Sequence, residues 1–415
     1  MDDARALVDA LTWSGRADPM RGAHVYADRV QDAAAVLVVL AEGDPKVAVP
    51  LLMLAVNRVT RALTWVDSSS GVAGEGLDQL IRAYARACES APPAPASLAK
   101  WLCALHFEGP GWPDFRLVWF KDALGAKGLA LIEQATQERA AAAAAVGGSF
   151  SQEYAVRSFR EQLAEASGDV DHYVSVLAED LRNAHGYIPI VDALLAAGRE
   201  DDAEAWARRG LADTPVGQYT APLRARLTEL LLEAGRGAEA VAENRAAFQA
   251  QPSATGYQVL RKTALAAGAW DTEHRPALDT LRAKAADGTP TWAFYLVAIL
   301  LDEGLEEEAW RYDLKHEDAL GAHQRLDLIK LRAVSHPGDV ILPYRELIDA
   351  KIDDPRDLKW RYKRALTMLK ALKTAYRRAR GPAGEAEFTA YLATLHETHR
   401  RKPSFVKLLD QARFD

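Results

Sequence analysis

A repeated arrangement of glycine and apolar residues constrains the fold of this chain more than any other feature. Four glycines, Gly198, Gly235, Gly268 and Gly304, follow one another at intervals of 37, 33 and 36 residues. Apolar residues stand eight, four and three positions before each glycine. They are Ile190, Leu227, Leu260 and Leu296; Leu194, Leu231, Ala264 and Leu300; and Leu195, Leu232, Leu265 and Leu301. A period of this length is typical of stacked helical hairpins.

The spacing within each repeat explains why it forms a hairpin. Steps of four and five residues put the apolar side chains on one face of a helix, and glycine follows where the chain reverses with a positive φ. A second helix comes after each glycine, and Ala203, Ala240 and Ala309 take a small, close-packed position in it. Hairpins of about 34 residues are tetratricopeptide-like, and each buries its apolar face only when a neighbour stacks on it. More degenerate units follow around residues 336–338 and 381–384.

The composition favours helix along the whole chain. Alanine, leucine, glutamate and arginine dominate its 415 residues, and such side chains lose little rotamer freedom in a helix. Gly147 and Gly148 follow a long alanine-rich segment and supply the stop that a helix end favours. We therefore expect an all-α protein, with an N-terminal helical domain over residues 1–148. A tetratricopeptide-like repeat domain with a basic C-terminal end is expected over residues 149–415.

The sequence contains few features of a membrane or secreted protein. Its only cysteines are Cys88 and Cys103, which is typical of a reducing compartment. The start of the chain has no basic segment followed by an apolar block, and the most apolar run, residues 33–41, is far shorter than the roughly 20 residues that cross a bilayer. We expect a cytoplasmic protein with no membrane partner.

Motifs of catalysis, cofactor binding and metal binding are equally scarce. The sequence holds no Gly-x-Ser-x-Gly elbow, no phosphate-binding loop and no His-Glu-x-x-His pair. The pairs Cys103 with His106 and His396 with His399 share helix faces, but two ligands do not complete a metal site. We predict no catalytic residue, no cofactor and no metal, and the sequence favours a binding protein over an enzyme.

Several segments resemble a known family. They are Gly111-Trp-Pro113, Ser167-Gly-Asp-Val-Asp-His172, Leu177-Ala-Glu-Asp-Leu181, Ala205-Trp-Ala-Arg-Arg-Gly210 and His399-Arg-Arg-Lys-Pro403. Through them the chain resembles the tetratricopeptide-like helical region of actinobacterial SWIM zinc-finger family proteins. A SWIM finger needs a Cys-x-Cys pair and a Cys-x-His pair because zinc takes four sulfur or nitrogen ligands, and neither pair is present. The resemblance implies a helical companion region without the zinc module, to which the contacts of the finger do not transfer.

The charge of the chain is unevenly distributed. Residues 356–415 carry 15 Lys and Arg against 6 Asp and Glu, a net charge of +9, whereas residues 1–355 carry 36 against 52, a net charge of −16. A basic helical flank predicts binding to the phosphates of DNA or RNA. The alternative is that the tail complements the acidic body of its own chain or of a twin subunit. The candidate basic residues are Lys359, Lys363, Arg364, Lys370, Lys373, Arg377, Arg378, Arg400, Arg401 and Lys402.

Aromatic residues gather in two short segments. Trp112 and Trp119 lie in and near a glycine- and proline-rich turn, and Trp292 and Tyr295 share one helical turn. These four side chains are candidates for the wall of a ligand groove. The alternative use is core packing between repeats, because aromatic side chains dominate the buried area of ordinary domains.

Three functions follow from these observations. The first is a non-catalytic helical-repeat scaffold that binds a protein or peptide partner on the concave face of the repeats. The second is a protein associated with DNA or RNA through the basic C-terminal helices. The third is an enzyme or accessory protein with a small-molecule pocket at the domain junction. The sequence determines neither the partner nor the oligomeric state, because fold class does not fix function.

Overall fold

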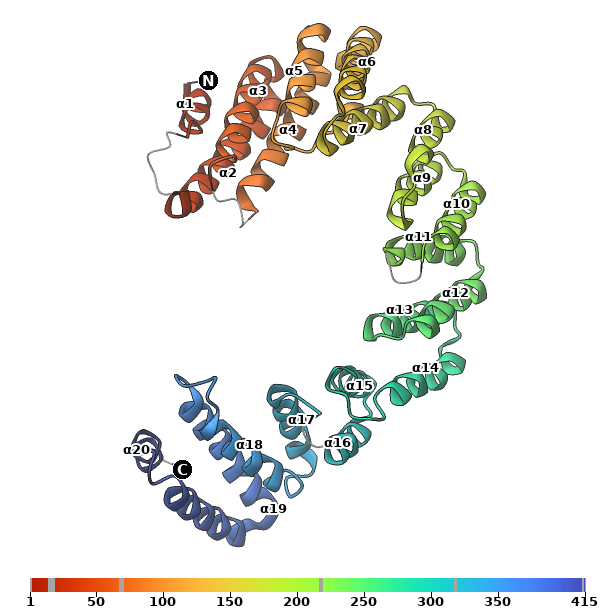
Figure 1. The fold of residues 1–415 in the computed structure, drawn as a ribbon. Helices are drawn as coiled ribbons and strands as arrows, with labels where there is room; N and C mark the ends of the chain where they lie inside the picture. The colour runs from red at the N-terminus through yellow and green to blue at the C-terminus, as the bar shows by residue number, and fades with distance from the viewer. Residues whose placement is uncertain are drawn as a thin grey trace. The chain divides into compact units, whose positions relative to one another are not determined.

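The structure is a computed structural model that describes residues 2–13, 19–66, 71–215, 219–316, 319–412 and 414. Within these residues every regular element is a helix: there are twenty α-helices, two short 3-10 helices and no strand (Figure 1). The prediction of an all-α protein is confirmed. The chain divides into two compact units, unit 1 from Met1 to Arg226 and unit 2 from Leu227 to Asp415.

Unit 1 begins with a group of helices that pack around one apolar core. Helices α2, α3 and α4 contact one another, α5 pairs with α6, and α7 contacts α5, α6 and the 3-10 helix η1. The bounds are α1 (Asp2–Ala10), α2 (Pro19–Gly43), α3 (Pro45–Ala62), α4 (Val72–Ser90), α5 (Pro95–Phe107), η1 (Leu117–Phe120), α6 (Lys121–Val146), α7 (Phe150–Ser167), α8 (Val170–Leu177), η2 (Ala178–Asp180), α9 (Ala184–Ala196) and α10 (Glu200–Asp213).

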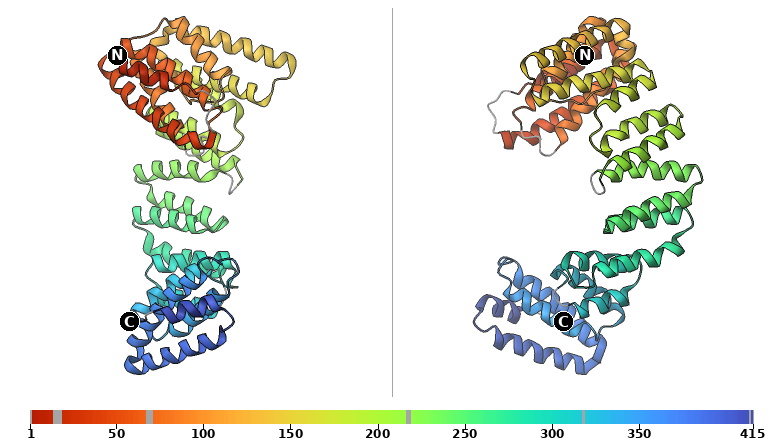
Figure 2. Two further views of the ribbon diagram at one scale, coloured as in Figure 1. Left: turned by 90° about the vertical axis from the view of Figure 1, so that its left-hand side faces the viewer. Right: turned by 45° about the vertical axis from the view of Figure 1, so that its right-hand side comes forward.

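Unit 2 consists of successive antiparallel helices, of which the last two are the long α19 and the short α20, as Figures 1 and 2 show. The division between the units falls within α11 (Thr220–Glu233). The remaining bounds are α12 (Gly237–Ala250), α13 (Ala254–Ala266), α14 (Trp270–Lys284), α15 (Pro290–Asp302), α16 (Glu306–Lys315), α17 (Ala322–Ser335), α18 (Ile341–Asp353), α19 (Arg361–Thr398) and α20 (Pro403–Gln411). Helix α19 contains a kink at Gly381, whose φ is +56°.

The four repeated glycines close the first helix of each hairpin in the same way. Gly198, Gly235, Gly268 and Gly304 have φ values of +72°, +73°, +66° and +72°, which only glycine adopts without strain. In each turn the backbone N–H of the residue after the glycine donates to the carbonyl oxygen of the residue four positions before the glycine, at 2.7 to 2.9 Å. This bond satisfies a helix-end carbonyl, as in a Schellman turn. The prediction of repeated helical hairpins is confirmed.

Burial within the repeat follows the predicted register with one correction. The residues eight and four positions before each glycine are all buried, and so are Ala203, Ala240 and Ala309 in the second helices. The residues three positions before the glycine lie at the margin of the buried face. Leu195, Leu232 and Leu301 are half-buried, and Leu265 is 55% exposed. One residue along a helix is a rotation of about 100°, which carries these side chains toward the edge of the contact.

The helix stop predicted at residues 147–148 is present, but the packing continues across it. Gly147 ends α6 with a φ of +69°, and α7 then begins at a capping box formed by Ser149 and Gln152. Because α7 packs against α5 and α6, residue 148 lies inside unit 1. That residues 1–148 fold as a domain of their own therefore stays a prediction.

Among the described helices, none combines the length and the apolar composition that crossing a bilayer requires.

The packing of Gly210 predicts an unusual effect on stability. A Cβ atom at this buried position of α10 would lie 2.5 Å from Cγ of Tyr187 and 2.6 Å from Cδ2 of Leu223. We expect Gly210→Ala to lower the free energy of unfolding by about 1–3 kcal/mol, as overpacking does. Helix propensity alone predicts that the substitution raises the free energy of unfolding, because alanine is favoured over glycine by about 1 kcal/mol within helices.

The matched control is Gly74→Ala in α4, where nothing lies within 4 Å of the added Cβ. We expect this variant to be as stable as the wild type or more stable. Urea unfolding followed by circular dichroism measures both changes. Equal stabilisation by the two substitutions would show that α10 is not closely packed at Gly210.

Candidate functional site

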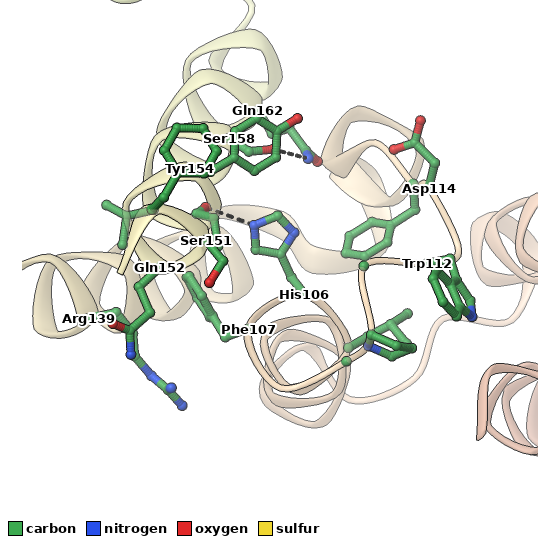
Figure 3. A pocket seen from close by; sticks show the side chains of 18 of the residues that line it. His106, Phe107, Trp112, Asp114, Arg139, Ser151, Gln152, Tyr154, Ser158 and Gln162 are labelled. Carbon is green, nitrogen blue, oxygen red and sulfur yellow. Dashed lines mark hydrogen bonds between the residues drawn. The ribbon is translucent and has the colours of Figure 1, made fainter. Parts of the chain in front are cut away.

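A hollow lies in unit 1, where α5, the turn after it, the end of α6 and the start of α7 meet. This α5–α7 pocket has a volume of about 670 Å³ and is open to one side (Figure 3). His106 and Phe107 come from α5, Trp112 from the turn, and Arg139 and Tyr154 from α6 and α7. The Trp112–Pro113 peptide bond in that turn is cis.

A cluster of aromatic rings, three of which line the pocket, holds α7 against α5. Phe159 of α7 is fully buried, and the His106 ring stacks on it with centroids 3.7 Å apart and planes within 8°. Phe107 meets Phe159 edge to face at 5.1 Å, and Phe115 does so at 6.2 Å. Aromatic pairs in such geometries add about 0.5–1.5 kcal/mol each beyond the burial of area. The cluster is therefore a packed structural layer.

His106 and Gln162 in the wall form hydrogen bonds within the chain. Nε2 of His106 donates to the Ala155 carbonyl oxygen at 2.8 Å, while the other ring nitrogen faces the turn that carries Asp114 (Figure 3). The side-chain oxygen of Gln162 accepts from the Leu117 backbone N–H at 2.9 Å. Burial lowers the pKa of His106, although its bond to Ala155 raises it. These contacts position α7 against α5 and η1.

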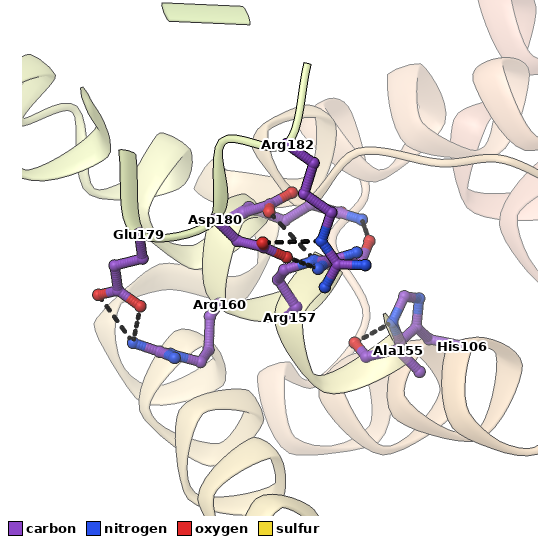
Figure 4. Close-up of polar contacts among 10 residues, drawn as sticks. His106, Ala155, Arg157, Arg160, Glu179, Asp180 and Arg182 are labelled. Carbon is purple, nitrogen blue, oxygen red and sulfur yellow. Dashed lines mark hydrogen bonds and ion pairs between the residues drawn. The ribbon is translucent and has the colours of Figure 1, made fainter. Parts of the chain in front are cut away.

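Ion pairs fix α7 to the segment that follows α8, on the side shown in Figure 4. Arg157 pairs with Asp180, whose second oxygen accepts from Nε of Arg182 at 2.8 Å. Arg160 pairs with Glu179 at 3.0 Å. The guanidinium groups of Arg182 and Arg157 hold the pKa of Asp180 below its usual value. The start of α7 is thereby held between α5 on one side and the η2 segment on the other.

The rim of the α5–α7 pocket exposes three large aromatic side chains. Trp112 is 39% exposed, Phe150 is 72% exposed and Tyr154 is 56% exposed. Phe150 and Tyr154 are one helical turn apart in the first turns of α7. The guanidinium of Arg157 lies 5.5 Å from the Tyr154 ring centre, and that of Arg139 lies 5.4 Å from the Phe107 ring centre. An aromatic rim with engaged polar groups is typical of a binding surface.

The four predicted groove residues do not form one wall. Trp112 lines the α5–α7 pocket, whereas Trp119 is half-buried with the Arg82 guanidinium 4.6 Å from its ring centre. Trp292 packs against the core of unit 2 and meets Tyr295 edge to face at 6.0 Å. The two pairs lie in different units. That any of the four binds a ligand stays a prediction.

The sequence search missed Phe150 and Tyr154. Two aromatic residues at i and i+4 in a helix start that is otherwise polar were a usable signal, since residues four apart share a helix face.

Five of the ten predicted basic residues make internal contacts in unit 2. Each contact joins the cation to a carboxylate or a backbone carbonyl of a described residue. The pairs are Arg364 with Asp357 at 2.8 Å, Lys373 with the Phe414 carbonyl at 2.5 Å, Arg378 with the Val334 carbonyl at 2.7 Å, Arg400 with Glu397 at 3.0 Å, and Lys402 with Asp353. Part of the charge of the tail is therefore satisfied inside its own unit.

The other five basic residues, Lys359, Lys363, Lys370, Arg377 and Arg401, are exposed. They form no ion pair with a residue that the structure describes. The ammonium groups of Lys359 and Lys363 lie 5.3 and 5.0 Å from the ring centre of Trp360. Binding of nucleic acid by any of the ten residues stays a prediction.

The thiols and histidines singled out in the sequence are used structurally. Burial raises the pKa of Cys88 to about 12 and that of Cys103 to about 11, which leaves both as unreactive thiols at neutral pH. The buried His399 contacts the ammonium of Lys402 through Nδ1 at 3.0 Å. In the described parts of the chain, no three His, Cys, Asp or Glu side chains gather in a way that could hold a metal ion.

The buried His106 predicts a pH dependence of stability. Because burial lowers its pKa below the ordinary value of 6.5, the fold favours the neutral ring. This stabilisation is fully present above pH 6.5, where the unfolded chain is also neutral, and is lost as the pH falls toward the folded-state pKa. We expect His106→Phe to flatten the decline in the free energy of unfolding between about pH 7.5 and 5.5.

The control is His185→Phe at an exposed position of unit 1, which should leave the decline as it is in the wild type. Urea unfolding at a series of pH values gives the slopes. A decline in His106→Phe as steep as in the wild type would contradict the assignment of a buried neutral imidazole.

The comparisons with solved structures return helical-repeat proteins. An IFIT1 monomeric mutant with Gppp-AAAA is 11% identical, with a TM-score of 0.28 over 99% of this chain and 93% of that one. Yeast Tom70 is 11% identical, with a TM-score of 0.26 over 93% and 88%. A circular tandem repeat protein is 14% identical, with a TM-score of 0.20 over 99% and 95%. Similarity this low carries no argument about what this chain binds.

The comparisons at the level of sequence point to one family. No curated protein matches the chain. The resemblance to the SWIM zinc-finger helical region is not among these findings and stays a prediction. Residues 15–258 match a family of unknown function, DUF6880. Because this match covers more than half of the chain, the protein belongs to the DUF6880 family.

Proposed function

We propose that this chain is a non-catalytic helical-repeat scaffold that binds a protein partner, and that the α5–α7 pocket receives an aromatic side chain of that partner. The observation that carries the proposal is the exposed rim of Trp112, Phe150 and Tyr154 around an open hollow of about 670 Å³. Exposed aromatic side chains are enriched in protein interfaces, where a few such anchors provide most of the binding energy.

The state of the polar groups favours binding over catalysis. A catalytic pocket needs a nucleophile or a base within reach of a substrate and free to exchange a proton. In the α5–α7 pocket, Nε2 of His106 donates to a backbone carbonyl and Gln162 caps a backbone N–H, so that Nδ1 is the one nitrogen of the neutral ring left to accept a proton. Ser151 contacts Ser149 at 3.0 Å, which belongs to the capping box of α7. These contacts hold α7 in place and leave the aromatic rim to make the external contact.

The repeat architecture is the second support for a scaffold. Stacked hairpins bury one side of each helix and leave long surfaces for partners, which is how such folds are commonly used. The concave face of the repeats as a binding surface, and a role as the companion region of a SWIM-like protein, belong to this proposal. We also propose a cytoplasmic location, in line with the free thiols of Cys88 and Cys103.

Selection of displayed random peptides on the purified full chain tests the proposal. We expect the selected peptides to share an aromatic anchor residue. Phe150→Ala and Tyr154→Ala should each weaken their binding by about tenfold, as the loss of an interface anchor does. Both side chains are mostly exposed, so the fold should tolerate the changes.

The matched control is Trp65→Ala, which removes a 72% exposed aromatic side chain elsewhere in unit 1 and should leave binding within about twofold. Fluorescence anisotropy with labelled peptides gives the dissociation constants. Peptides that bind the Phe150 and Tyr154 variants as tightly as the wild type, or turnover of a small molecule by a chain that selects no peptide, would overturn the proposal.

A further inference from the structure

We propose that the outer surface of α19, with the groove between α19 and α20, is a docking site for an acidic amphipathic helix of a partner protein. This site lies in unit 2 and uses none of the residues of the α5–α7 pocket. It adds a second surface to the proposed scaffold, and the two surfaces can be tested separately.

The first observation is a straight row of cations on α19. Lys363, Lys370 and Arg377 are all exposed and follow one another at seven-residue intervals. Seven residues are close to two helical turns, so the three side chains leave one face of the helix, about 10.5 Å apart along its axis. Thr367 and Thr374 lie between them on the same face and are also exposed.

The second observation is that this row is not neutralised within the structure. Lys363, Lys370 and Arg377 form no ion pair with the residues that the structure describes, whereas their neighbours Arg364 and Arg378 are bound to acceptors of unit 2. The row therefore presents three charges to a partner. Such charges steer a partner and select its sign, although each exposed charge contributes little affinity by itself.

The third observation is a partly apolar groove beside the row. It has a volume of about 460 Å³ and is lined by Lys363, Leu366, Thr367 and Lys370 of α19 and by Leu408, Gln411 and Ala412 from the α20 side. Leu366, Leu408 and Ala412 are half-buried, so their apolar surface remains partly open. The groove therefore offers apolar surface from these three residues beside two ammonium groups, together with the polar side chains of Thr367 and Gln411.

A helix with regularly spaced carboxylates matches these three observations together. Carboxylates at i, i+7 and i+14 repeat the distance of about 10.5 Å that separates the cations. Leucine side chains between the carboxylates, at i+4 and i+11, fall on the adjoining face and can enter the groove. Burial of one leucine side chain is favourable by about 1.5–3 kcal/mol, which the rim charges alone do not provide.

Nucleic acid uses less of this surface. Its phosphates neutralise cations, but the leucine side chains of the groove offer nothing to a phosphodiester backbone. The exposed aromatic residue beside the row, Trp360, has the ammonium groups of Lys359 and Lys363 about its ring, at 5.3 and 5.0 Å from the centre. Base stacking needs an open aromatic face. We therefore argue for the acidic helix and treat nucleic acid as an outcome of the test.

The test uses the full chain and a labelled synthetic helical peptide with glutamate at i, i+7 and i+14 and leucine at i+4 and i+11. A peptide of the same composition has its glutamates at i, i+5 and i+10, which spreads them around the helix. We expect fluorescence anisotropy to show that the first peptide binds at least about fivefold more tightly, and that its affinity falls as salt rises, because exposed charges are screened within about 8 Å at physiological ionic strength.

Charge reversal identifies the surface. The variant K363E/K370E/R377E should weaken binding of the first peptide by about tenfold or more, since it places like charges against the glutamates. The control K262E/K284E/K315E makes a similar change in net charge at exposed positions of α13, α14 and α16 and should change binding by less than about threefold. The neutral variant K363Q/K370Q/R377Q should fall between them, and thermal unfolding confirms that each variant is folded.

Other occupants give different results. Equal binding of the two peptides, or no binding, overturns the proposal. Tighter binding of a single-stranded RNA or duplex DNA of matched charge, lost in K363E/K370E/R377E, overturns it in favour of nucleic acid. Sedimentation showing a dimer that the same variant dissociates overturns it in favour of a second copy of this chain. Phe150→Ala should bind the peptide as the wild type does, so failure of this site and failure of the α5–α7 pocket are distinguishable.

Discussion

The structure depends on one constraint: an amphipathic helical hairpin cannot remove its apolar face from water unless another hairpin covers it. In unit 2 the result is a continuous core that runs from Val241 in α12 to Leu409 in α20. Leu260 and Leu296, which occupy equivalent positions of successive repeats, are 1% and 3% exposed. Each repeat is therefore stable only as part of a series, and the glycine turns matter because they bring the second helix of each pair back onto this core.

Buried polar contacts fix how neighbouring helices align once the apolar faces meet. Asn244 of α12 is 3% exposed, and its amide donates to the hydroxyl of Thr228 in α11 at 2.8 Å and contacts that of Thr263 in α13 at 3.4 Å. Glu303, after α15, accepts from the hydroxyl of Tyr257 in α13 at 3.0 Å. A leucine-lined face tolerates sliding by part of a turn, whereas an unsatisfied buried amide or carboxylate is costly. These contacts therefore favour one alignment.

The sequence could predict the repeated parts of the fold, because the same pattern occurs in several copies and a deviation in one copy does not hide it. The glycine turns and the positions eight and four residues before them are as expected. The sequence could not predict that α7 packs against α5. Gly147 and Gly148 mark the end of a helix, but they do not show whether the next helix packs against the same core. The link is the stack of His106 on Phe159, two residues 53 positions apart with no motif to join them. The α5–α7 pocket exists because this stack holds α7 against α5. The sequence therefore did not predict the exposed Phe150 and Tyr154 as residues of its rim.

The basic C-terminal segment shows why a count of charges does not define a surface. Along α19 the cations fall on adjacent helical lines, since Arg364 and Arg378 each follow a member of the row by one residue, a rotation of about 100°. The side chains on the second line reach Asp357 and the Val334 carbonyl. Those on the first line, Lys363, Lys370 and Arg377, form no ion pair with a residue that the structure describes. The seven-residue period was visible in the sequence, but which line meets an acceptor depends on where α17 and the segment after α18 pack. The net charge of the tail therefore has two parts. One part is paired inside the unit, and the other is available to a partner, and only the second part can contribute to recognition.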